Sequence, residues 1–129
     1  MGMLHYYNYP ETEIFGFDEF LICQIRECAE IQPEHNNKLN EVIQKHFSGK
    51  NMVYISNRVN SYSLNPLTYV HTEKIPNLLA SAMIPETKFM KKKKKNAKFE
   101  RDFFDKPYEI FDNLNKAIEW AHTIVKNSN

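Results

Sequence analysis

Residues 52–67 have the sequence MVYISNRVNSYSLNPL, and this stretch decides the expected fold. Residues 52–55 are apolar or aromatic and suit a buried strand, whereas residues 57–63 are almost all polar. Asn65 followed by Pro66 is typical of a helix N-cap with proline at the first helical position. The stretch therefore predicts a strand, a polar loop and a helix. In open α/β sheets, ligands and partners bind outside the carboxyl ends of such strands.

The sequence before residue 52 predicts an antiparallel hairpin and one helix. Residues 4–9, 13–17 and 20–26 carry strand-like aromatic and branched side chains, with a polar break at Asp18-Glu19. This pattern indicates a hairpin, with a further N-terminal strand as an option. A helix is expected to open at Gln32-Pro33 and to close at Ser48-Gly49. His35 and His46 lie on or near its apolar stripe, which favours boundary positions over metal binding.

The sequence after residue 67 predicts two more strands. The apolar run LLASAMI, residues 78–84, is typical of a central strand covered on both faces, and residues 108–111 suit a short strand. A short helix is expected over residues 66–72, and another over residues 89–104, or from Asn96 if the lysines form a loop. A final helix follows, capped by Asp112 or Asn113, and its predicted buried stripe is Leu114, Ala117, Ile118, Ala121 and Val125.

These elements predict one α/β domain over residues 1–129. Strands separated by helical crossovers favour a mixed, mostly parallel β-sheet with an N-terminal antiparallel hairpin and about four helices. The chain length of 129 residues fits a single core, and the apolar share of 42% is typical of a globular protein rather than a disordered one.

Composition also favours a cytoplasmic protein with reduced thiols. The first residues lack a signal peptide pattern, and no apolar run approaches the roughly 20 residues of a membrane span. Cys23 and Cys28 are too few for a disulfide framework and are a weak metal signal without clustered histidines. We expect no metal site and no cofactor.

The charge is strongly polarised along the chain. Residues 86–106 hold nine basic residues against four acidic ones, although the whole chain carries a formal net charge of only +1. Residues 88–96 are expected to form a flexible basic loop or a solvated face. The alternative is contact with an anionic partner, such as a phospholipid surface or, less favoured, nucleic acid. The lysines that would make this contact are Lys91, Lys92, Lys93, Lys94 and Lys95.

Motifs that carry chemistry are scarce in this sequence. The five histidines are dispersed without a metal-ligand spacing, and three glycines cannot supply a phosphate-binding loop of standard type. No G-x-S-x-G elbow surrounds Ser56, Ser61 or Ser63. We therefore expect a protein without catalytic residues.

The segment after the strand at residues 52–55 is the best candidate for binding. If this strand and residues 78–84 are neighbouring parallel strands, hydroxyls, helix N–H groups and cations gather at their carboxyl ends, where they favour a phosphate or carboxylate. The alternative is that these polar groups only cap a turn and a helix. The candidate binding residues are Arg58, Asn60, Ser61, Tyr62, Ser63 and Asn65.

The element order and the C-terminal block FFDKPYEIFDNLNKAIEWA, residues 103–121, resemble the STAS domain and, more closely, its SpoIIAA-like relatives of CRAL-TRIO-like architecture. In STAS antagonists, a serine in the loop after the third strand is phosphorylated and controls binding to a kinase-like partner. The matching stretch here is residues 60–64, Asn-Ser-Tyr-Ser-Leu, where the family typically has Asp-Ser-Ser-Gly-Leu. The resemblance implies that Ser61 is the phosphoacceptor, with Ser63 as a shifted candidate.

The sequence thus predicts a non-enzymatic regulatory module that binds a protein partner through residues 56–67. A small-ligand protein is the alternative, because CRAL-TRIO-like relatives imply an apolar pocket, here for a lipid or an anionic metabolite; Tyr54 is a suitable lining residue. Binding of an anionic surface or nucleic acid through the lysine run is the third hypothesis. A homodimer formed through an edge strand at residues 4–9 is a further option.

Overall fold

The computed structural model describes residues 5–10, 12–25, 29–31, 35–57, 62–64, 77–84 and 106–128. Eight strands and two helices lie in these ranges. The strands are β1 (His5–Asn8), β2 (Thr12–Gly16), β3 (Phe20–Ile25), β4 (Ala29–Ile31), β5 (Met52–Asn57), β6 (Tyr62–Leu64), β7 (Leu78–Ile84) and β8 (Tyr108–Ile110); the helices are α1 (His35–Phe47) and α4 (Leu114–Asn127).

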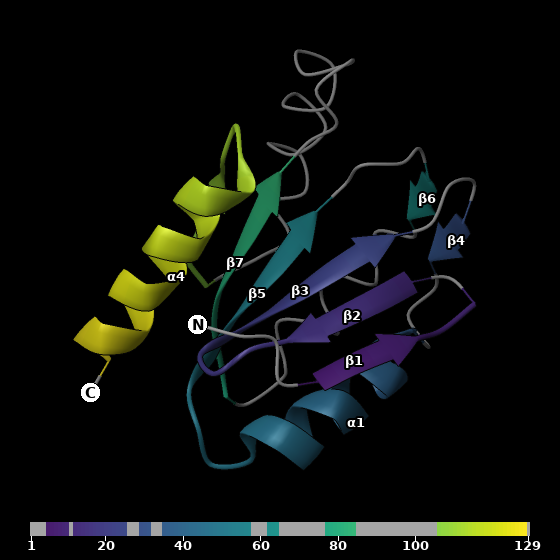
Figure 1. The fold of residues 1–129 in the computed structure, drawn as a ribbon, viewed down its shortest axis with the longest axis horizontal. Coiled ribbons are helices and arrows are strands. Elements are labelled where there is room, and N and C mark those ends of the chain that lie inside the picture. The colour runs from purple at the N-terminus through teal and green to yellow at the C-terminus, as the bar shows by residue number, and fades with distance from the viewer. Residues whose placement is uncertain are drawn as a thin grey trace.

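Six strands form one mixed sheet in the order β1-β2-β3-β5-β7-β8 (Figure 1). The first three are antiparallel neighbours, and β3, β5, β7 and β8 run parallel. Phe17 N–H donates to the carbonyl of Phe20 at 2.9 Å, which closes the β2–β3 turn around the expected polar pair Asp18-Glu19. The predicted mixed sheet with an antiparallel start is confirmed, and so is the parallel pairing of β5 with β7.

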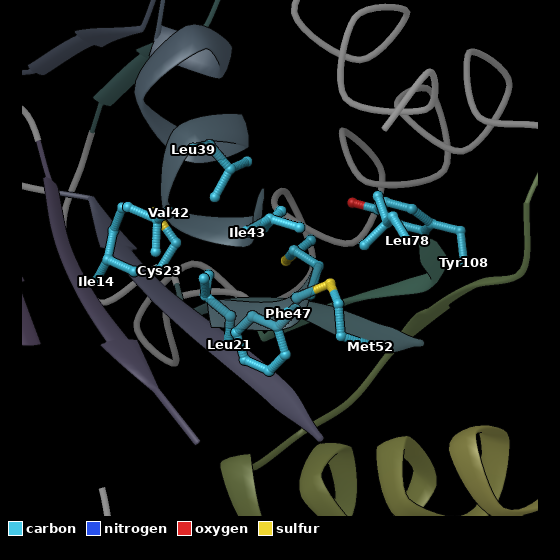
Figure 2. Close-up of a cluster of buried hydrophobic side chains, with 11 residues drawn as sticks. Ile14, Leu21, Cys23, Leu39, Val42, Ile43, Phe47, Met52, Leu78 and Tyr108 are labelled. Atoms are coloured by element: carbon cyan, nitrogen blue, oxygen red, sulfur yellow. The ribbon is translucent and has the colours of Figure 1, made fainter. Parts of the chain in front are cut away.

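Each face of this sheet is covered by one of the two helices. Alternate side chains along the strands point to opposite faces, so β3 directs Leu21 and Cys23 to one face and Phe20 and Ile22 to the other. The first face packs against α1, and we call it the α1 face (Figure 2). The other face packs against α4 and includes the wholly buried Ala80 and Ala82 of β7, Ala117 and Ala121 of α4, and Val53 and Ile55 of β5.

The beginning of α4 and the end of α1 were both predicted from residues close to them in the sequence. Asn113 caps α4, because its Oδ1 accepts a hydrogen bond from the N–H of Lys116 at 3.0 Å. The stripe of α4 is also confirmed, with Ala117, Ala121 and Val125 buried. At the end of α1, Gly49 has φ of 70°, a left-handed conformation that glycine adopts without a steric penalty. The predicted close at Ser48-Gly49 is therefore confirmed.

Two expectations about segments between these elements need correction. Residues 57–63 were expected to be a polar loop, but β5 continues to Asn57 and β6 includes Tyr62 and Ser63. β4 was not expected at all. Backbone pairing with neighbouring strands outweighs polar composition here, because strand formation depends strongly on context. The described residues contain two helices, so the expected four are not confirmed; the helices predicted over 66–72 and 89–104 lie outside the described residues.

Candidate functional site

The carboxyl ends of three parallel strands meet at one edge of the sheet. Gln24 of β3, Asn57 of β5 and Ile84 of β7 are paired in a single row across that edge. Arg58 comes directly after Asn57 in the chain. This is the edge where open α/β sheets bind ligands and partners.

A second parallel pair follows the first one along the chain. Gln24 pairs with Asn57 in the main sheet, and Ala29 pairs with Tyr62 in the two-stranded β4–β6 sheet. Ala29 comes five residues after Gln24, and Tyr62 comes five residues after Asn57. The β4–β6 sheet therefore has the same offset in residue number as the β3–β5 pair, although it is a separate two-stranded sheet. Figure 1 shows β4 and β6 side by side beyond the end of β3.

The β4–β6 pair carries two of the predicted binding residues. Tyr62 is opposite Ala29, and Ser63 is opposite Glu30. Arg58, Asn60, Ser61 and Asn65 lie outside the described residues, as do Lys91 to Lys95 and Cys28. Within the predicted binding segment, the structure therefore describes residues 56 and 57 and the strand β6.

Four hydroxyl side chains lie together on the α1 face, and we call them the hydroxyl strip. Tyr54 of β5 pairs with Ser81 of β7, which pairs with Tyr108 of β8, and Ser56 follows Tyr54 on the same face. Ser56, Ser81 and Tyr108 are buried and Tyr54 is half-buried. Neighbouring strands are about 4.8 Å apart, so Ser81 lies directly between Tyr54 and Tyr108 on this face. Polar groups concentrated in an otherwise apolar face can orient a bound molecule.

Sequence reasoning named Tyr54 as a lining residue but did not select Ser81 or Tyr108. The available signal was the alternation along β5 and β8, which assigns Tyr54, Ser56 and Tyr108 to one face. The pairing of Ser81 with both Tyr54 and Tyr108 depends on strand order, which the sequence alone does not give.

The histidines take structural positions, as expected for His46. Nε2 of the half-buried His46 forms a hydrogen bond with the hydroxyl of Tyr7. Burial is the main cause that lowers the pKa of His46, and the neighbouring His5 and Lys45 add to it. On the other face, Nδ1 of His122 lies 2.7 Å from Oε2 of Glu19.

The ranges that the structure describes hold no group of three or more His, Cys, Asp or Glu side chains able to bind a metal ion. Cys23, on the α1 face, is buried and is not part of a disulfide. No helix within these ranges is long and apolar enough to cross a membrane.

Comparisons with protein-family models, with curated proteins and with solved structures find no match for this chain. The geometry of the carboxyl edge, the β4–β6 pair and the hydroxyl strip is therefore the basis for a functional proposal.

Proposed function

We propose that this chain is a non-enzymatic, STAS-like binding module that docks a protein partner through residues 56–67. The observation that carries the proposal is that the Gln24–Asn57 and Ala29–Tyr62 pairs share the same offset in residue number. Residues 58–61 are held at both ends by paired strands, at Asn57 and at Tyr62. A segment fixed at both ends loses less conformational entropy on binding than a free loop does. Its position past the carboxyl edge suits contact with a partner.

Phosphorylation of Ser61 is the proposed control of this docking. A phosphate adds a charge of about −1.5 to −2 at neutral pH, which can engage or repel nearby charged groups. Ser63 is the weaker candidate, because it occupies the register position opposite Glu30. Like charges at directly opposed strand positions destabilise the pair, so a phosphate on Ser63 would weaken β4–β6.

A quantitative pull-down with Ser61→Asp and Ser61→Ala tests this proposal. We expect Ser61→Asp to change the amount of captured partner while the circular dichroism spectrum stays that of the wild type. Asn115→Asp, at an exposed site on α4, is the matched control and should capture the wild-type amount. Unchanged capture by both Ser61 variants would refute the switch.

A small-ligand protein is the second candidate, and the hydroxyl strip favours it. Tyr54, Ser56, Ser81 and Tyr108 offer polar contacts beside apolar side chains such as Met83. Native mass spectrometry of freshly purified protein is the test. A retained non-protein mass that is lost in Ser81→Val would support this candidate, whereas a clean apo mass from the wild type would count against it.

A further inference from the structure

The edge strand β1 is joined to α1 by a continuous series of aromatic rings. The imidazole rings of His5 and His46 are stacked, with centroids 3.4 Å apart and planes at 21°. The hydroxyl of Tyr7 forms a hydrogen bond with Nε2 of His46. Tyr9 is stacked on Tyr7 at 5.9 Å, and Nζ of Lys38 lies 5.3 Å from the centre of the Tyr9 ring. The side chains of His5, Tyr7 and Tyr9 therefore attach one face of β1 to the helix.

The backbone opposite His5 leaves room for this arrangement. His5 pairs with Gly16 of β2, and a Cβ atom at Gly16 would lie 3.3 Å from the Cβ of His5. A side chain there would press on His5, so glycine permits the histidine to keep its stacked position. The stacking of His5 on His46 of α1 therefore also depends on Gly16 of β2.

The charges around the two imidazoles disfavour protonation. Lys45 of α1 is a cation near His46, and β1 contributes His5 and the neutral Tyr7. Within the described part of the chain, no carboxylate forms an ion pair with either ring. At the far end of the series, burial is the main cause that raises the pKa of Tyr9, and Tyr7 and Glu41 add to it. A proton on His46 would therefore meet a partly buried, cationic environment without a compensating anion.

We propose that the His5–His46 pair is a pH switch that holds β1 against α1 at neutral pH and releases it on mild acidification. A proton on His46 puts a positive charge beside Lys45 in a partly buried site, and protonated Nε2 can then only donate in its hydrogen bond with the Tyr7 hydroxyl. β1 is most exposed to this effect because β2 is its single neighbour in the six-stranded sheet. Acidification thus loosens one edge of the sheet and leaves its centre paired.

The direction of the pH effect follows from the lowered pKa of His46. Above the unfolded value of 6.5 both states are neutral at this residue, and the group has no effect on stability. We call the state with β1 released the open state and the state with β1 held against α1 the closed state. As the pH falls below 6.5, His46 takes up a proton in the open state before it does so in the closed state. The closed form is therefore progressively disfavoured until the pH reaches the lower pKa of the closed state.

Hydrogen exchange of the Tyr9 amide measures the release directly. This N–H donates to the carbonyl of Thr12 at 2.9 Å, and it is protected only while the β1–β2 hairpin is closed. We expect its protection factor, corrected for intrinsic exchange, to fall roughly tenfold between neutral and mildly acidic pH. The Ser81 amide, bonded to the carbonyl of Pro107 at 2.9 Å, is the internal reference and should keep its protection.

Variants separate the switch from a general acid effect. His5→Phe with His46→Gln keeps a ring and a hydrogen-bond partner for Tyr7 but does not titrate, so the pH response of Tyr9 should disappear. His5→Phe alone, which removes the contribution of His5 to the lowered pKa of His46, should reduce the response. His122→Gln, on the opposite face, should leave it at the wild-type size. An unchanged Tyr9 protection factor in the wild type, or a full pH response in the double variant, would overturn the proposal.

Discussion

The side-chain amide of Asn77 donates a hydrogen bond to the backbone carbonyl of Phe47, the last residue of α1, at 2.9 Å. The same nitrogen lies 3.1 Å from the carbonyl of Lys50, and its oxygen accepts a bond from Gln44 at 3.1 Å. The side chain of Asn77, just before β7, thus joins the Lys50 N–H in donating to the last carbonyl of α1 and also bonds the Lys50 carbonyl beyond the helix. It also attaches α1 to the strand that lies beside β5.

Replacing Asn77 should therefore lower the free energy of unfolding, although this side chain is only partly buried. We expect Asn77→Ala to lower the free energy of unfolding by about 1–2 kcal/mol, because the carbonyls of Phe47 and Lys50 each lose a hydrogen bond from the Asn77 amide. Urea denaturation followed by circular dichroism measures the change. Asn115→Ala, at an exposed position of α4, should stay within about 0.5 kcal/mol of the wild type. Equal stability of the two variants would contradict the role of Asn77.

Small side chains determine how closely α4 approaches the sheet. Ala117 and Ala121 of α4 and Ala80 and Ala82 of β7 are all wholly buried in one cluster. Ala121→Leu should destabilise the protein by about 1–3 kcal/mol, since the added atoms have no space without moving the helix. Thermal denaturation gives the measurement. Thr123→Leu adds bulk at an exposed position of the same helix and should have little effect; a similar loss in both would refute the close contact.

Thr12 offers a stabilising substitution. Its side chain is wholly buried, and its Oγ1 has no hydrogen-bond partner among the residues that the structure describes. A buried hydroxyl without a partner carries a desolvation cost, which a methyl group of similar size removes. Thr12→Val should raise the free energy of unfolding by roughly 1 kcal/mol in urea denaturation. A loss of stability would show that the hydroxyl has a partner in solution. Thr123→Val, exposed on α4, controls for the substitution itself.

The sequence predicted those elements whose signals are local. The strand at residues 78–84 was predicted with the bounds that β7 has, because an uninterrupted apolar run between Asn77 and Pro85 is sufficient to define it. The cap of α4 followed equally from Asn113 and the stripe behind it. In both cases, residues close in the chain determine the structure.

The β4–β6 pair could not be predicted in this way. Tyr62 and Ser63 are polar or aromatic residues in a polar stretch, and they form a strand because Ala29 and Glu30 lie beside them. Such pairing depends on contacts between residues that are distant in the chain, so composition alone favours a loop. The parallel pairing of β5 with β7, on which the predicted site depends, is present, whereas the loop expected at residues 57 and 62–63 is replaced by strand.

Site-specific photo-crosslinking tests the proposed docking segment most directly. A photoreactive phenylalanine analogue such as p-benzoylphenylalanine replaces Tyr62 on β6 in one sample and the exposed Thr123 on α4 in another, and each is irradiated with the captured partner. The proposed function predicts a covalent adduct with the partner from position 62 and none from position 123. An adduct from position 123 alone, or none from position 62 in a sample that still binds the partner, would contradict it.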